Sequence, residues 1–239
     1  MYFLYFFYQW LIFLPLFLVI TILTALVTIV GSILGNGNFW GYYPGRIWSR
    51  LVCIFALLPV EVRGREHIDK DTSYIFVPNH QGYFDIFLIF GYLNHNLKWM
   101  MKKSLRKLPF VGYACECAGN IFVDDSGAKG VRSTILQARK VLRGGMSLVI
   151  FPEGSRTLDG KLHRFKKGAF QLADDIHLPI VPVTLEGPYQ VMRRGTYLMK
   201  PHRLVMTIHK PIPYKEGPHE VTKRMEEARR VIAESLGEA

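Results

Sequence analysis

The first 45 residues contain no Asp, Glu, Lys or Arg, although the chain of 239 residues carries a net charge of +11. The whole positive excess therefore lies on residues 46–239. Such asymmetry suggests an acidic partner, which could be nucleic acid, an anionic membrane or a negatively charged substrate. The uncharged first segment favours the membrane. No nucleic-acid-binding module is recognisable, so we expect no nucleic-acid partner.

Cysteine is scarce, and its pattern argues against two kinds of stabilising site. The three cysteines are odd in number and form no CxxC pair, which indicates neither a disulfide framework nor a zinc site. We expect reduced, buried thiols in a cytoplasmic enzyme. The histidines outside the motifs described below are scattered without ligand spacing, so we predict no metal site; they are His67, His95, His177, His202, His209 and His219.

Residues 1–34 are apolar almost throughout. At ~1.5 Å per residue, a straight helix of this length reaches roughly 50 Å, which exceeds the ~30 Å hydrocarbon core of a bilayer. Part of it can therefore lie in the interface, or Pro15 can kink it. A cleaved signal peptide fits poorly, because there is no positive n-region and no small-residue cleavage site. We expect a retained membrane anchor.

The first basic residues, Arg46 and Arg50, follow this apolar segment. The positive-inside rule then predicts that the rest of the chain lies on the cytoplasmic side of the cell membrane. Residues 46–60 resume an apolar stretch, which predicts a second helix on or in the bilayer. A true span and a two-helix hairpin that re-enters one leaflet are both compatible with this pattern. We assign residues 1–60 to the anchor and 61–239 to a separate domain.

Beyond the anchor, short apolar runs alternate with helical patterns. This alternation predicts an α/β domain with a mixed, largely parallel sheet flanked by helices. Polar motifs follow two of the expected strands, which is where open α/β sheets usually bind ligands. We expect strands at 73–77, 120–123, 146–151, 180–185 and 203–209, and helices at 85–93, 129–143, 165–173 and 221–236.

The first motif is the segment Asn79–Asp85, in which His80 and Asp85 stand five residues apart across a turn that contains glycine. A carboxylate on one ring nitrogen fixes the tautomer, and the other nitrogen can then take a proton from a hydroxyl. This is the base and orienting half of a catalytic triad without its nucleophile. Taken alone the spacing is weak, because a loop histidine with a local hydrogen bond is commoner.

The second motif, residues 151–157, directly follows an expected strand. Gly154, Ser155 and Thr157 supply backbone and hydroxyl donors, and Arg156 adds a cation that can bind an anion through two nitrogens. The loop is therefore a candidate receptor for phosphate or carboxylate. Ser155 is not in a Gly-x-Ser-x-Gly elbow, so we do not expect it to be a covalent nucleophile.

A basic cluster lies between the two motifs. It is either a solvated face or a contact for anionic lipid head groups or an acidic carrier protein. We regard Lys102 and Lys103 as possible donor or lipid contacts. The full cluster is Lys98, Lys102, Lys103, Arg106 and Lys107.

Together these motifs resemble one family, the lysophosphatidic acid and glycerol-3-phosphate acyltransferases. Residues 79–85 match its first block, Asn-His-x4-Asp, which contains the HX4D motif, and residues 151–157 match its third block. Residues 119–124 match the start of the second block, 165–168 a basic element, and 178–183 the fourth block. The blocks occur in order and at the expected separations, so the resemblance is specific where each block alone is not.

The resemblance implies direct acyl transfer, without an acyl-enzyme, to a lysolipid hydroxyl. The leading acceptor is 1-acyl-glycerol-3-phosphate, which would give phosphatidic acid. The donor would be a thioester of coenzyme A or acyl carrier protein, with no bound cofactor. His80 would be the general base and Asp85 its partner. We assign substrate binding to Glu153, Gly154, Ser155, Arg156, Thr157 and Lys167.

One departure from the family concerns the acceptor. The second block usually continues after Asp124 with an Arg that helps to bind the acceptor phosphate, but here the residue is Asp125. An acidic residue there would repel phosphate unless a nearby cation pairs with it; the candidates are Lys102, Lys103, Lys129 and Arg132. A lysolipid with another head group, such as a lyso-amino-acid lipid, is therefore the alternative acceptor.

A non-catalytic lipid-binding membrane protein that keeps the same fold is the alternative of another class. Loss of a catalytic residue would favour it. His80, Asp85 and Glu153 are all present, so we expect an enzyme.

Overall fold

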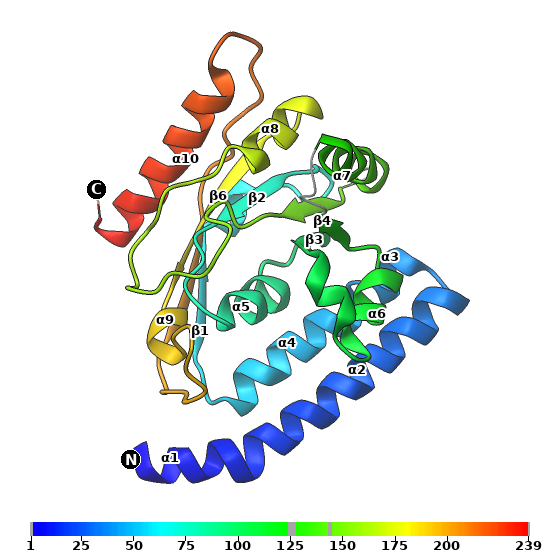
Figure 1. Ribbon diagram of the computed structural model, residues 1–239. Helices are drawn as coiled ribbons and strands as arrows, with labels where there is room; N and C mark the ends of the chain where they lie inside the picture. Colours follow the sequence, from blue (N-terminus) through cyan, green and yellow to red (C-terminus); the bar gives the residue numbers. More distant parts are fainter. Residues whose placement is uncertain (1, 124–127, 143–144, 239) are drawn as a thin grey trace.

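A seven-stranded sheet forms the centre of the protein, whose computed structural model describes residues 2–123, 128–142 and 145–238 (Figure 1). Its strand order is β1-β7-β6-β2-β5-β3-β4, and β6 and β7 are the antiparallel pair. Five strands therefore run one way and β1 and β7 the other. This confirms the predicted mixed, largely parallel sheet. The strands are β1 (Val60–Arg63), β2 (Ile75–Pro78), β3 (Leu97–Lys102), β4 (Ile121–Val123), β5 (Ser147–Val149), β6 (Ile180–Glu186) and β7 (Leu204–Ile208).

Helices cover both faces of the sheet, as predicted (Figure 1). The central strand β2 is buried throughout, and its successive side chains point to opposite faces. Phe76 joins a core cluster that also contains residues of α4 and α5, whereas Ile75 and Val77 join a second cluster formed with α8 and α10. These helices are α4 (Tyr43–Phe55), α5 (Phe84–Tyr92), α8 (Gly168–Asp175) and α10 (Glu220–Leu236).

The N-terminal segment is one long helix that lies along the side of the domain (Figure 1). It consists of α1 (Tyr2–Tyr8), a π-helical turn (Gln9–Phe13) and α2 (Leu14–Leu34). Pro15 directly follows the π-helical turn inside this continuous helix, where its missing N–H removes one helical hydrogen bond. Among the described residues, Phe3–Leu34 is the one helix long and apolar enough to cross a membrane, judged by length and composition, with a mean hydropathy of 2.7.

The helix α4 packs between α2 and α5 (Figure 1). Two tyrosines of the N-terminal helix donate hydrogen bonds to the C-terminal end of α4. Tyr5 Oη donates to the carbonyl of Ala56 at 2.9 Å, and Tyr8 Oη donates to that of Phe55 at 2.7 Å. The long helix and α4 thus form a two-helix unit, and α5 connects this unit to the sheet. The predicted boundary after residue 60 falls one residue into β1, which begins at Val60.

Several elements differ from the sequence-based expectations. The strands β1 and β3 were not predicted, because charged residues interrupt both of them. The helix expected at 165–173 begins only at Gly168. Cys53 is buried as expected, but Cys115 and Cys117 are half-buried. The remaining helices are α3 (Gly37–Trp40), α6 (Val111–Cys117), α7 (Ala128–Val141) and α9 (Pro188–Val191), with 3-10 turns at Arg65–His67 and Lys103–Lys107.

Candidate active site

The turn between β2 and α5 brings His80 and Asp85 into contact. The Nδ1 atom of His80 lies 2.6 Å from Oδ2 of Asp85, and the Gly82 amide donates to the same oxygen at 2.9 Å. The Asp85 side chain is fully buried, whereas that of His80 is 16% exposed. A carboxylate only accepts hydrogen bonds, so Nδ1 carries the proton and Nε2 is left as a proton acceptor.

Burial raises the pKa of Asp85 above its ordinary value, although the His80 ring and the Gly82 amide stabilise its charged form. The position of Asp85 in the first turn of α5 also favours negative charge, because free N–H groups point towards it. Within the described residues, Nε2 of His80 has no hydrogen-bond partner. The dyad is therefore arranged to accept a proton from a group that approaches Nε2.

Aromatic stacking holds the plane of the His80 ring. The ring of Phe151, just after β5, lies parallel to it, with centroids 3.8 Å apart and an interplanar angle of 17°. The Trp99 ring of β3 is also nearly parallel to that of Phe151, with centroids 6.1 Å apart and an interplanar angle of 16°. Three neighbouring strands thus contribute to one column of rings. The role of Trp99 was not predicted, since it lies in a strand that was missed.

Glu153 joins the two motif loops. Its Oε1 accepts a hydrogen bond from the His80 amide at 2.7 Å, and its Oε2 accepts one from the His163 amide at 3.0 Å. The Thr157 amide donates in turn to the His80 carbonyl at 2.9 Å. Burial raises the pKa of Glu153, and these amides oppose the rise. Both carboxylate oxygens are thus engaged by backbone, so the geometry favours a positioning role for Glu153.

Asn79 anchors the turn that carries His80 to the next strand. Its Nδ2 donates to the carbonyl of Leu185 at 3.0 Å, and its Oδ1 accepts from the Leu185 amide at 2.7 Å. The side chain of Asn79 is buried, so a loss of either bond would leave an unpaired polar group. The sequence motif contains Asn79 but does not reveal this partner, which is about a hundred residues away.

The predicted substrate-binding residues lie in different environments. The Arg156 guanidinium lies over the Tyr83 ring, 3.7 Å from its centroid, and Ser155 is exposed. The buried Thr157 hydroxyl is 2.8 Å from Oδ1 of Asp159, which favours a structural role. Beside Gly154, the nearest side-chain atoms belong to Lys166, which sequence reasoning did not select. Lys167 is exposed at the start of α8.

The structure separates the members of the basic cluster. Lys98 is 2% exposed and donates to the carbonyl of Ala118 at 2.5 Å, so its assignment to a surface cluster was wrong. The first three residues of β3 are all buried, because this part of the strand lies inside the sheet with both of its faces covered. Lys102 and Lys103 are exposed where β3 ends, and Arg106 pairs with Glu116. Lys129, Arg132 and Asp125 lie outside the residues whose side chains are described.

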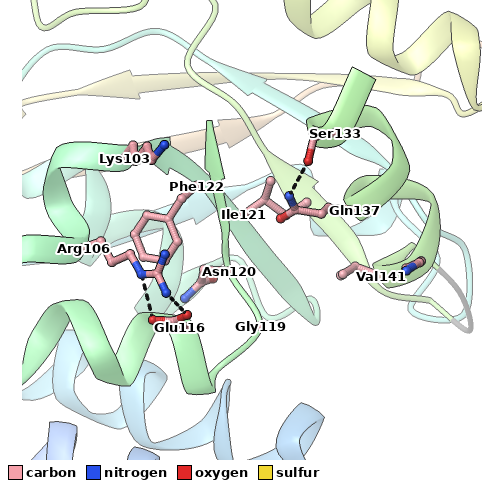
Figure 2. Close-up of a pocket in the computed structure, with 11 residues that line it drawn as sticks. Lys103, Arg106, Glu116, Gly119, Asn120, Ile121, Phe122, Ser133, Gln137 and Val141 are labelled. Atoms are coloured by element: carbon pink, nitrogen blue, oxygen red, sulfur yellow. Dashed lines mark hydrogen bonds and ion pairs between the residues drawn. The ribbon is translucent and has the colours of Figure 1, made fainter. Parts of the chain in front are cut away.

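A separate pocket of about 450 Å³ lies near this cluster, between α6 and α7. Lys103, Arg106 and Glu116 line one side of it, and Ser133 and Gln137 of α7 line the other (Figure 2). It shares no lining residue with the His80 site. Within the described part of the chain, no group of three or more His, Cys, Asp or Glu side chains could hold a metal ion.

Comparison with known proteins decides the family. The model of the acyltransferase family matches residues 59–186, which is more than half of the chain and includes both motif loops. The chain belongs to the acyltransferase family. The family resemblance seen in the motifs is thereby confirmed.

Among its relatives is a chloroplastic 1-acyl-sn-glycerol-3-phosphate acyltransferase of Brassica napus, 29% identical over 82% of this chain and 56% of the relative. An enzyme of the same name from Helicobacter pylori is 36% identical over 56% of each chain. The chain thus spans little more than half the length of these two curated relatives.

A solved structure shares the fold. The 1-acyl-sn-glycerophosphate acyltransferase PlsC from Thermotoga maritima superimposes with a TM-score of 0.76 at 26% sequence identity, covering 88% of this chain and 86% of that one. The match therefore extends beyond residues 59–186 to most of the molecule, including parts that the family model does not reach.

Proposed function

We propose that this chain transfers a fatty acyl group from a thioester to the free hydroxyl of a lysolipid. The observation that carries the proposal is the buried His80–Asp85 pair, whose Nε2 has no partner within the described residues and stands beside a loop that carries Arg156. The base His80 can accept the proton of a hydroxyl, and the nearby Arg156 can bind a phosphate, so the site suits an acceptor that has both groups.

In the proposed reaction, Nε2 of His80 takes the proton from the acceptor hydroxyl while the hydroxyl oxygen attacks the thioester carbonyl. The Asp85 carboxylate stabilises the imidazolium that forms. The tetrahedral intermediate then collapses, the carbon–sulfur bond breaks, and the thiolate takes the proton from the imidazolium. An ester and a free thiol are the products, and no covalent acyl-enzyme is needed.

The acceptor proposed first is 1-acyl-glycerol-3-phosphate, which would give phosphatidic acid. The names of the curated relatives and of the Thermotoga structure support this choice. The donor would be acyl-coenzyme A or acyl carrier protein. A lyso-amino-acid lipid is the second candidate, because Asp125 stands where the family usually carries Arg.

We also propose that the protein sits at the cell membrane with its α/β domain on the cytoplasmic side. The apolar helix Phe3–Leu34 supports membrane attachment, and the basic residues Arg46 and Arg50 that follow it support the orientation.

An acceptor screen tests the proposed activity. The purified full chain is incubated with labelled acyl-coenzyme A or acyl carrier protein and with lysophosphatidic acid, other lysophospholipids or lyso-amino-acid lipids. We expect labelled phosphatidic acid as the main product. Transfer only to a lyso-amino-acid lipid would show that this lipid, and not 1-acyl-glycerol-3-phosphate, is the acceptor. No transfer to any lysolipid would contradict the proposal.

A further inference from the structure

The helix α9 and the start of the loop that leads from it to β7 pack directly on the turn that carries His80. A Cβ placed on Gly82 would lie 2.8 Å from the carbonyl oxygen of Pro188 and 3.1 Å from that of Met192. Two residues further along, Arg194 Nη1 donates to the backbone carbonyl of Arg156 at 3.2 Å. Arg194 therefore lies at the second motif loop, although residue 194 falls outside the region that the family model matches.

This contact places a second guanidinium beside the Arg156 loop, and neither arginine has an acidic partner among the described residues. The Nη1 atom of Arg156 is buried without a hydrogen-bond partner in the described structure. A buried donor without a partner is unfavourable, and a charged one more so. Arg194 is exposed and keeps further N–H donors beyond the one that binds the Arg156 carbonyl.

We propose that Arg194 is a specificity-determining residue that binds the acceptor phosphate together with Arg156. This inference rests on the proposed acyl transfer to a phosphate-bearing lysolipid. Guanidinium groups bind phosphate oxygens through paired hydrogen bonds, so two arginines can hold one phosphate from two sides. Arg194 would supply the cation that this sequence lacks at position 125, where Asp replaces the usual Arg.

The N-terminal helix holds the other end of the same loop. Gln9 is buried in the π-helical turn, where its Nε2 donates to the Tyr197 carbonyl and its Oε1 accepts from the Met199 amide at 2.9 Å. Tyr197 and Leu198 are exposed next to this contact. The loop that carries Arg194 is thus fixed between the apolar helix and the turn that carries His80, where the head group of a membrane lysolipid would reach it.

Steady-state kinetics with lysophosphatidic acid as the variable acceptor test this inference. We compare wild type with Arg194→Gln and with Arg193→Gln, a matched control that also removes one charge and whose guanidinium lies 5.1 Å from the Tyr189 ring centroid. We expect Arg194→Gln to raise KM about ten- to a hundredfold, as for the loss of a charge-assisted hydrogen bond, with kcat essentially unchanged. Arg194→Lys should recover part of the loss, and Arg193→Gln should resemble wild type.

Three results would overturn the inference while leaving the proposed function intact: an unchanged KM in Arg194→Gln, equal effects in the two glutamine variants, or a fall in kcat alone. Equal effects would indicate general electrostatics, and a fall in kcat alone would indicate a structural role. Absence of phosphatidic acid with the wild-type protein would instead contradict the proposed acceptor, and this inference with it.

Discussion

The Oδ2 atom of Asp85 holds both the His80 ring and the turn that carries it, since it accepts from His80 Nδ1 and from the Gly82 amide. An amide in place of the carboxylate can satisfy these two donors only through its single oxygen, and it no longer stabilises an imidazolium. We expect Asp85→Asn to lower kcat by about 10²–10⁴, the usual contribution of general base catalysis. Steady-state turnover with a saturating acceptor measures this.

Asp159→Asn is the matched control for this substitution. Asp159 lies 3.1 Å from His163, both side chains are about half exposed, and within the described residues Asp159 makes no contact with the side chain of His80 or Asp85. Its kcat should stay close to that of wild type. Near-normal turnover in Asp85→Asn would mean that Asp85 does not orient the base.

Glu153 offers a second residue-level prediction, because each of its oxygens accepts from a backbone amide. A glutamine has one acceptor oxygen, so one amide would face an NH₂ group and lose its partner. We expect Glu153→Gln to lower the free energy of unfolding by about 1–3 kcal/mol and to reduce kcat more than it raises KM. Thermal unfolding in detergent and acceptor kinetics measure the two effects. A selective rise in KM would instead support the acceptor-binding role that the family resemblance implies.

Lys98 makes stability depend on pH. Burial lowers its pKa from 10.5 to about 8. Below pH 8 the Lys98 side chain is protonated in both the folded and the unfolded protein. Between pH 8 and 10.5 it keeps its proton only in the unfolded protein. The Lys98 contribution to the free energy of unfolding therefore rises with pH in this range, by ~1.4 kcal/mol per unit. Relative to Lys98→Met, wild type should gain stability from pH 8 to pH 10, as followed by chemical unfolding; parallel profiles would show that Lys98 keeps an ordinary pKa.

The candidate residues of the site could be selected from the sequence, and the structure brings His80 and Asp85 together, but the residues that support them could not be predicted. His80, Asp85 and the 151–157 loop form compact motifs whose chemistry follows from residue type and spacing. The stacking on Phe151 and Trp99, and the pairing of Asn79 with Leu185, join residues far apart in the chain. No local pattern reveals such partners, because they depend on which strands become neighbours in the sheet.

At the scale of elements, α4 and α5 connect the apolar helix to the turn that carries His80. A Cβ on Gly45 of α4 would lie 2.3 Å from the Phe90 ring of α5, so the two helices approach too closely for a larger residue. We expect Gly45→Val to lower the free energy of unfolding by about 1–3 kcal/mol, as overpacking usually does. The thermal unfolding midpoint in detergent measures this.

Ile47→Val in the same helix serves as the comparison, since Ile47 is 58% exposed and the loss of one methyl group there leaves no buried cavity. Its unfolding midpoint should match that of wild type. A Gly45→Val protein as stable as wild type would mean that α4 and α5 can move apart without loss, and that the two-helix unit is loosely attached.

Two elements lie close to the ranges expected from the sequence, whereas one turn of the N-terminal helix could not be predicted. The expected strand at 180–185 and helix at 221–236 are present as β6 and α10, because the first is a continuous apolar run and the second repeats apolar residues at helical spacing. The π-helical turn at Gln9–Phe13 was not foreseen. It places Gln9 against the loop near Tyr197, and that contact spans almost the whole chain.

At the scale of the whole molecule, apolar surface and charge are segregated along the chain. The long N-terminal helix is mostly exposed and uncharged, whereas all the charged residues lie on residues 46–239. Composition predicted this division, and the alternation of apolar runs with helical patterns predicted the α/β class. The attachment of the helix to the loop that carries Arg194 could be read only from the fold, because it joins the two ends of the sequence.

The central claim is that His80 removes a proton from the hydroxyl of a lysolipid acceptor. Its most direct test compares wild type with His80→Ala in the transfer of a labelled acyl group to lysophosphatidic acid, with vesicle flotation to verify that both proteins bind membranes equally. We predict labelled phosphatidic acid from wild type and none above background from His80→Ala. Equal product formation by the two proteins would contradict the account.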